Sequence, residues 1–179
     1  MSLPVASGTW AIDNAHSTVE FIVRHLGLSN VRGRFSTFDA KLLVGADLNS
    51  SSISATIDLT SVDTNNADRD AHLKGTDFFN AENHPTMTFT STSITGSGDE
   101  YKVVGDLVIN GVSKPVTLDV EFNGTEKNPF TGAETVGFSA KAEIKRSDFK
   151  IDFQVPLGGD KFLVSDKVRI ELEAEFTAA

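Results

Sequence analysis

The sequence predicts an all-β domain of about eight antiparallel strands, built either as a sandwich or as a closed barrel. Apolar and polar residues alternate in several short runs, which is typical of strands with one buried face and one wet face. Gly, Asn, Asp and Ser separate these runs at short intervals, as turns require. No Pro/Ser-rich linker, composition shift or internal repeat divides the 179 residues, so we expect a single domain.

The first strand pattern, within residues 10–35, is the most informative part of the chain. The alternate positions that share one face of this strand are apolar and end in a histidine: Val19, Phe21, Val23 and His25. The other parity is assigned to the outer face: Thr18, Glu20, Ile22 and Arg24. His25 therefore lies at the end of an apolar stripe, where it could bind a polar group at a cavity mouth. The alternative is a histidine that is hydrogen-bonded inside a core.

Six later runs show the same alternation, and their polar partners are clearest in the last run, where Arg and Glu residues intervene. Their inward positions are Ile53, Ala55, Ile57, Leu59; Met87, Phe89, Ser91; Tyr101, Val103, Gly105, Leu107, Ile109; Val116, Leu118, Val120, Phe122; Val136, Phe138, Ala140, Ala142, Ile144; and Val168, Ile170, Leu172, Ala174, Phe176. Asn110-Gly111 lies between two runs, where a two-residue hairpin turn favours this pair. The runs therefore predict strands joined by tight turns.

Two segments break the alternation. The first predicts a short helix near 66–75, because Asn residues suited to capping precede it and Asp70 lies four residues before Lys74. Gly75 is expected to end this helix. The second segment, 146–166, is long for a hairpin loop, which predicts a lid or rim element.

The amino-acid composition excludes or disfavours several kinds of chemistry and of binding partner. The chain has no cysteine, which excludes disulfides, thiolate nucleophiles and cysteine-bound zinc. A net charge of −9 disfavours nucleic acid and any standing contact with an anionic membrane. No apolar run is long enough for a transmembrane helix, so we expect no stable membrane insertion. The start lacks the pattern of a signal peptide, which predicts a cytoplasmic protein, or a periplasmic or secreted one if a signal peptide was removed.

Several motifs, in this order, resemble the YceI-like family of polyisoprenoid-binding proteins. The opening motif consists of Trp10, Ile12-Asp13, His16-Ser17, Phe21, Val23, His25, Gly27 and Gly33-Arg34-Phe35. Further matches lie at 67–79, 84–94, 107–122 and 137–151. The resemblance implies an extended, lipocalin-like, eight-stranded antiparallel β-barrel over 10–177, preceded by an N-terminal extension over 1–9. It also implies binding, storage or transport of a long-chain lipid such as an isoprenoid quinone or a prenyl pyrophosphate.

Thirteen Phe residues stand against one Trp and one Tyr. Phe has no polar atom, so it can line an apolar cavity without leaving a hydrogen bond unmade. The candidate wall residues are Phe21, Val23, Phe35, Phe89 and Phe138 by parity or motif, and Phe78, Phe79, Phe149 and Phe153 where irregular segments meet the sheet. The alternative for some of them is ordinary core filling.

The polar head of such a ligand needs donors near the opening of the barrel. The candidates are His25, Arg69, His72 and Lys74. For Arg69 the alternative is an ion pair with a neighbouring aspartate or a surface position. We further expect the predicted helix and the segment 146–166 to gate lipid exchange, with static plugs as the alternative.

Catalysis is the competing class of function. Four His residues and several Asp residues supply acid–base groups, but the chain contains no HExxH, GxSxG, P-loop or GxGxxG motif. Asp70 and His72 are two residues apart on the predicted helix, so they would not share a face or a metal. We therefore expect a binding protein that needs no cofactor or metal. An enzyme acting on a lipid, a ligand-free stress-related interaction module, and a homodimer stay open.

Overall fold

The computed structural model describes residues 1–159 and 161–179, so one residue of the predicted rim segment lies outside the described residues. Thirteen strands are present: β1 Gly8–Ile12, β2 Thr18–His25, β3 Ser29–Phe35, β4 Phe38–Val44, β5 Ser52–Asp58, β6 Val62–Asp63, β7 Thr86–Ser97, β8 Glu100–Ile109, β9 Val112–Lys127, β10 Glu134–Lys145, β11 Pro156–Gly158, β12 Lys161–Phe162 and β13 Lys167–Ala178. One α-helix, α1 Ala67–Lys74, and three 3₁₀ helices, η1 Asn14–His16, η2 Leu59–Ser61 and η3 Arg146–Phe149, complete the described fold. No helix among the described residues is both long enough and apolar enough to cross a membrane.

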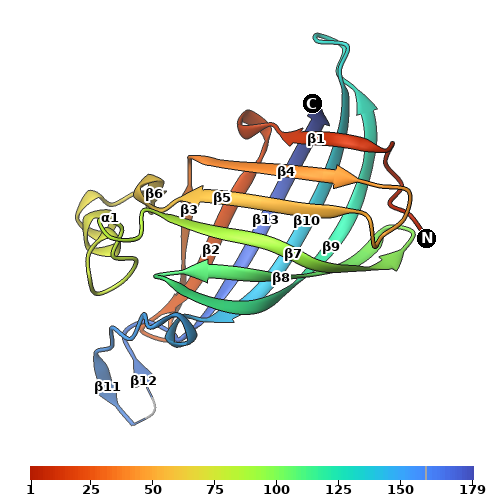
Figure 1. The fold of residues 1–179 in the computed structure, drawn as a ribbon. Helices are drawn as coiled ribbons and strands as arrows, with labels where there is room; N and C mark the ends of the chain where they lie inside the picture. Colours follow the sequence, from red (N-terminus) through yellow and green to blue (C-terminus); the bar gives the residue numbers. More distant parts are fainter. Residues whose placement is uncertain (160) are drawn as a thin grey trace.

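The strands close into a barrel, as the family resemblance predicted (Figure 1). The order β1-β4-β5-β7-β8-β9-β10-β13 forms a ring because β1 also pairs with β13. The strands β2, β3 and β6 continue the courses of β1, β4 and β5 beyond short breaks, so the barrel has eight antiparallel courses. Closure leaves no long free edge around this ring, and it settles the earlier choice between sandwich and barrel.

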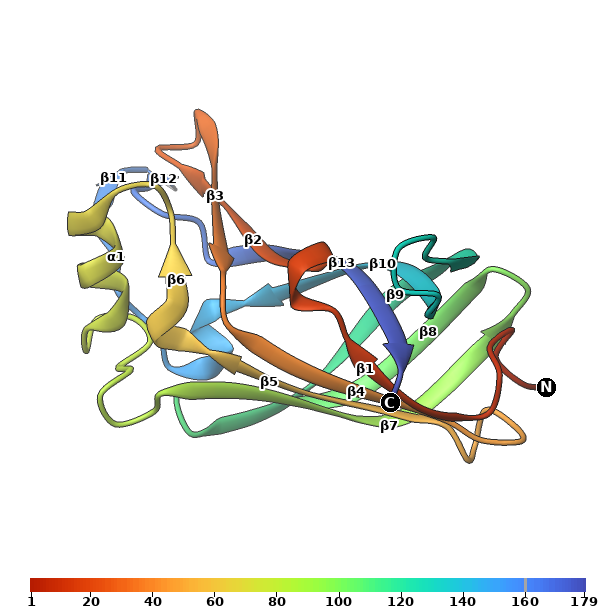
Figure 2. The same cartoon turned by 90° about the horizontal axis from the view of Figure 1, so that it is seen from above.

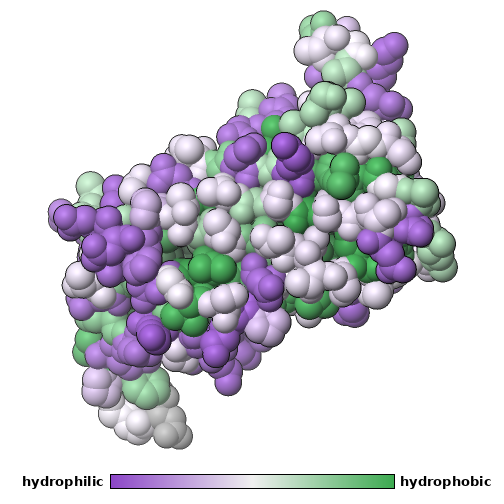
Figure 3. All heavy atoms as spheres, viewed as in Figure 1, coloured by the Kyte–Doolittle hydropathy of each residue, from purple (hydrophilic) through white to green (hydrophobic). Residues whose placement is uncertain are grey.

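Alternation along the strands sends one parity inward, as predicted. In β8 buried residues occur at every second position, and cross-strand pairs between β10 and β13 join predicted inward residues to each other, for example Phe138 to Ala174 and Ala140 to Leu172. The outer surface in Figure 3 is mostly polar or neutral, with apolar residues in small groups. A bulge between Ser91 and Ser93 reverses the parity of β7. Ile94 therefore faces inward, a position that simple alternation does not predict.

Ile22 departs from the predicted pattern. Its parity places it on the outer face, yet it is only 2 % exposed. Its direct cross-strand partners are Arg32 on β3 and Arg169 on β13. Long arginine stems on both sides can exclude water from an outward apolar side chain, and we attribute the burial of Ile22 to them.

Two glycines make room for phenylalanine rings on the inner face. Gly33 pairs directly with Phe21, and a Cβ at Gly33 would lie 2.2 Å from the tip of that ring. A Cβ at Gly105 would lie 2.4 Å from the ring of Phe89 and 2.7 Å from the carbonyl oxygen of Thr90. Each ring thus lies flat over a neighbouring strand, which explains the glycine of the Gly33-Arg34-Phe35 motif.

The predicted helix is present, and its contacts differ in one respect from the expectation. The Asn66 side chain caps α1 by accepting a hydrogen bond from the backbone N–H of Arg69. Asp70 accepts from the backbone N–H and the hydroxyl of Thr64, at 2.9 and 2.6 Å. Its carboxylate therefore fixes the chain before α1, in place of the expected pair with Lys74.

The two ends of the barrel differ in construction. Helix α1 and the β11–β12 hairpin lie at one end, and the N-terminus lies at the other in both views (Figures 1 and 2). At the N-terminal end Leu3 is buried, and the backbone N–H of Leu48 donates to the carbonyl oxygen of Met1. Residues 1–7 therefore lie across that end of the barrel.

Candidate ligand cavity

The barrel interior contains a cavity of about 290 Å³, close to the lower limit of the ~300–1,000 Å³ typical of ligand sites. The described residues present only apolar surface to it. Charged residues such as Glu20 and Glu173 reach the lining, yet their polar atoms do not. Inward residues of all eight strand courses therefore form a continuous hydrocarbon wall, in agreement with the predicted alternation.

Most of the predicted wall residues line this cavity. They are Phe21, Val23, Phe35, Phe78, Phe79, Phe89, Phe138 and Phe149. Phe153 and the head-group candidates His25, Arg69, His72 and Lys74 are not among the lining residues. The structure thus separates the predicted set into an interior wall and an outer group near α1 and the rim.

Three rings from distant segments of the sequence form an aromatic cluster in the wall. Ring centroids are 5.5 Å apart for Phe21 and Phe35, 6.4 Å for Phe21 and Phe79, and 5.7 Å for Phe35 and Phe79. Phe79 follows α1, so this cluster joins the segment after the helix to β2 and β3. Tilted and edge-to-face pairs of this kind add to the energy of simple burial.

A second cluster connects α1 to the segment 146–166. The ring of His72 lies edge-to-face on Phe78 at 5.0 Å and on Phe153 at 5.1 Å, and the two Phe rings are 5.0 Å apart. The Nε2 atom of His72 is 2.9 Å from Asp77 Oδ2. Since Phe78 also lines the cavity, this cluster, here called the mouth cluster, is the outer layer over the hydrocarbon interior.

The other head-group candidates have defined partners. Arg69 donates from Nε to the hydroxyl oxygen of Thr64 at 2.7 Å, and from Nη2 to the Thr64 carbonyl oxygen at 2.6 Å. This contact replaces the aspartate ion pair that we weighed as an alternative. His25 forms an isolated bridge with Val164, which links the end of β2 to the rim segment.

Arg146 was not among the predicted site residues, yet it shapes the mouth. It is 5 % exposed, and its guanidinium donates to the carbonyl oxygens of Ile151, Val164 and Ser165 at 2.9, 3.2 and 3.0 Å. Burial lowers the pKa of Arg146, and the charges of Asp166 and Asp152 oppose that shift. The side chain therefore fastens both ends of the rim segment to the barrel.

A sequence signal for Arg146 exists in the alternation itself. It continues the inward parity of β10 two residues after Ile144, and its carbon atoms do reach the cavity lining. A basic residue at an inward position requires several backbone acceptors to remain buried. The prediction stopped at Ile144 because only apolar residues were counted as inward.

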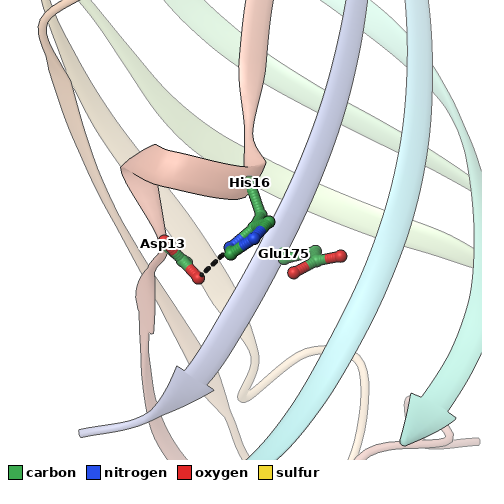
Figure 4. A group of neighbouring side chains, drawn as sticks. All are labelled: Asp13, His16 and Glu175. Atoms are coloured by element: carbon green, nitrogen blue, oxygen red, sulfur yellow. Dashed lines mark hydrogen bonds and ion pairs between the residues drawn. The ribbon is translucent and has the colours of Figure 1, made fainter. Parts of the chain in front are cut away.

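One group of possible metal ligands lies outside the cavity. Ligand atoms of Asp13, His16 and Glu175 are all within 4.8 Å of one another (Figure 4). Asp13 already accepts from the backbone N–H of Ala15 and lies 2.8 Å from His16 Nδ1. These contacts account for the arrangement, and we assign no metal to it.

The hydrogen bond between these two residues shifts both pKa values. Asp13 raises the pKa of His16, first through the hydrogen bond and then through its charge, and Glu175 adds to the effect. The same hydrogen bond lowers the pKa of Asp13. The pair therefore ties the turn after β1 together over the pH range where Asp13 is ionised and His16 is protonated.

Related sequences cover nearly the whole chain. A UPF0312 protein of Staphylococcus epidermidis is 40 % identical over 166 residues, covering 92 % of this chain and 95 % of that protein. A UPF0312 protein of Staphylococcus aureus strain N315 is 39 % identical over 171 residues, covering 94 % and 96 %.

Solved structures with the same architecture extend the comparison. BcnA of Burkholderia cenocepacia has a TM-score of 0.79 at 28 % identity, covering 92 % of this chain and 98 % of that one. A YCEI protein of Campylobacter jejuni has a TM-score of 0.72 at 35 % identity, covering 87 % and 90 %. A polyisoprenoid-binding domain of Saccharophagus degradans, with a TM-score of 0.64 at 15 % identity over 95 % and 98 %, shares the fold. The YceI-like domain profile matches residues 10–176, and the chain therefore belongs to the YceI-like family.

Proposed function

We propose that this protein binds a long-chain isoprenoid or a similar amphiphilic lipid, with the hydrocarbon tail inside the barrel. The observation that carries the proposal is the cavity inside the barrel, to which the described residues present only apolar surface. Each buried methylene contributes about 0.8 kcal/mol, so a few isoprene units can offset the cost of ordering a flexible chain. The fold shared with the Saccharophagus degradans polyisoprenoid-binding domain supports the isoprenoid class.

The apolar lining also favours a head group outside the cavity and a function without catalysis. A phosphate or quinone oxygen inside the cavity would lose its hydrogen bonds, which favours a head group outside the hydrocarbon wall. The mouth cluster offers a polar group there, because its His72 and the adjoining Asp77 are both exposed. A cavity that offers a ligand no polar atom from its described lining also supports storage or transport over chemical conversion.

Native mass spectrometry of gently purified protein, followed by lipid extraction, tests the proposal. The expected result is a co-purifying lipid, or saturable 1:1 uptake of a prenyl quinone or prenyl phosphate by the emptied protein. Absence of both would refute the carrier function and favour the ligand-free module.

A matched pair of variants tests the location of the tail. Ala140→Phe adds a ring inside the cavity, and Lys141→Phe adds the same ring on the outer face of the same strand. We expect the inner variant to lose lipid uptake while remaining folded by circular dichroism, and the outer variant to keep it. Equal uptake by the two folded variants would place the lipid elsewhere.

A further inference from the structure

Two loops from opposite halves of the sequence lie side by side at the mouth end of the barrel. The turn between β2 and β3 contacts the residues that directly follow β12. There the backbone N–H of Leu26 donates to the carbonyl oxygen of Leu163 at 2.9 Å. The N–H of Ser165 donates to the carbonyl oxygen of Arg24 at 3.0 Å, and Leu163 returns to Val155 in the same way. The turn and the β11–β12 hairpin therefore form one continuous surface, here called the mouth rim (26–28, 155–159 and 161–164).

The mouth rim leaves four large apolar side chains partly or largely exposed in the described part of the chain. The structure gives seven exposed large hydrophobic residues in its described part, and four of them belong to this rim: Leu28, Val155, Leu157 and Phe162. Leu28 is 75 % exposed. β11 and β12 pair only with each other among the described strands, and the hairpin projects from the barrel (Figure 1). Isolated apolar residues are ordinary on a protein surface, whereas such a group on adjoining projecting loops marks an interaction site.

The mouth rim is continuous with the cavity. Val164, at the edge of the rim, lines the cavity, and so does Arg146, which holds the segment in place. Phe153, just before the hairpin, belongs to the mouth cluster that covers the interior. Residues that flank the hairpin on both sides thus contact the hydrocarbon wall or the mouth cluster.

Local charge on these loops differs from that of the whole chain. Residues 24–28 and 146–167 together carry five basic and four acidic residues, a formal net charge of +1 against −9 for the protein: Arg24, Arg146, Lys150, Lys161, Lys167, and Asp148, Asp152, Asp160, Asp166. The remainder of the chain therefore carries −10. These loops would therefore repel an anionic lipid surface less than the remainder of the chain does.

We propose that the mouth rim docks transiently on a lipid bilayer, with Leu28, Leu157 and Phe162 entering the interface between headgroups and acyl chains. This inference rests on the proposed lipid-binding function, because a tail taken from a membrane needs an apolar route into the barrel. Contact through a few side chains gives weak, reversible attachment. The partner of the mouth rim is thus the membrane that contains the lipid ligand.

The test uses phosphatidylcholine vesicles that contain dansyl-labelled geranylgeraniol. The double variant Leu157→Asp/Phe162→Asp places two charges on the mouth rim, and Phe130→Asp places one on the most exposed hydrophobic side chain, 95 % exposed, at the tip of the β9–β10 hairpin at the opposite end. We expect the double variant to reduce vesicle flotation and the rate of probe transfer about tenfold or more, because each side chain loses its contact with hydrocarbon. The Phe130 variant should match the wild type.

A second arm separates this proposal from the function on which it rests. The same probe supplied from detergent solution should bind all three proteins with equal affinity, since neither variant alters the cavity wall. Loss of binding from detergent in the wild type refutes lipid binding itself. Unchanged transfer from vesicles in the double variant, or an equal loss in the Phe130 variant, overturns membrane docking. Light scattering tests a further outcome. If the wild type is a dimer, the double variant is a monomer and transfer is unchanged, the rim binds a second copy of the chain, and membrane docking is overturned.

Discussion

The barrel wall and the barrel mouth are built on different principles. In the wall, each strand repeats one rule, apolar inward and polar outward, and cross-strand pairs such as Ala140 and Leu172 place the same face together. At the mouth, individual contacts determine the structure: Arg146 on three carbonyl oxygens, Arg69 on Thr64, and His72 on two Phe rings. Burial spread over many residues tolerates single changes better than a clamp made by one side chain.

Arg146→Met is expected to have the largest effect. It leaves the carbonyl oxygens of Ile151, Val164 and Ser165 without their donor in a buried region. We expect a loss of about 2–4 kcal/mol in the free energy of unfolding, measured with urea, and faster amide exchange over 146–166. The control, Lys167→Met, removes an exposed 3.7 Å ion pair with Glu143 and should cost less than about 1 kcal/mol. Similar losses for the two variants would show that Arg146 is no clamp.

Gly105→Ala tests the wall. The new Cβ would collide with the ring of Phe89 and with the backbone of Thr90, so the ring must move into the cavity. We expect a loss of about 1–3 kcal/mol in thermal unfolding together with weaker lipid binding. Gly137→Ala is the matched control, because its Cβ meets only Asn123 at 3.7 Å and its stability should change by less than about 0.5 kcal/mol. A neutral Gly105→Ala would disprove the close approach of Phe89.

Phe153→Ala tests whether the mouth cluster retains the ligand. It removes two aromatic contacts, each worth about 0.5–1.5 kcal/mol, from the outer layer over the cavity, while the cavity wall itself is unchanged. We expect a bound fluorescent prenol to dissociate several-fold and up to about tenfold faster in stopped-flow measurements. An unchanged dissociation rate would mean that the ligand does not leave past this cluster.

The Asp13–His16 pair gives the smallest effect and a defined pH dependence. The raised pKa of His16 contributes stability that is fully present below the ordinary histidine pKa and is lost as the pH rises through the folded value. The lowered pKa of Asp13 contributes stability that is present above its ordinary value and is lost as the pH falls through the folded one. NMR titration of His16 should show a pKa above about 6.5 that falls toward this value in Asp13→Asn. No fall in that variant would contradict the pairing.

The residues of the barrel wall could be predicted from the sequence because burial there follows a period of two. Phe21, Phe89 and Phe138 were assigned from parity or motif alone, and all three line the cavity. The same rule failed after Ser91, where a bulge inserts one residue, and at Ile22, where flanking arginines bury an outward position. Both exceptions depend on neighbouring strands, which local alternation does not describe.

The mouth was less predictable because its contacts join segments far apart in the chain. Helix α1 followed from its capping residue, but the partner of Asp70 did not, since a turn before the helix competes with the expected Lys74. Arg146 was missed because its acceptors lie up to 19 residues away and become visible only when the rim segment folds back. The inward parity of Arg146 is visible in the sequence, whereas the carbonyl oxygens that it binds are not.

Closure of the ring by β1 and β13 has a consequence for how the protein is made. Trp10 pairs with Ala178, so the first course must wait for the last before the barrel is complete. Until β13 is synthesised, β1 and β2 lack that neighbour and present unpaired backbone groups, which could pair wrongly on the ribosome. Such long-range pairing slows folding.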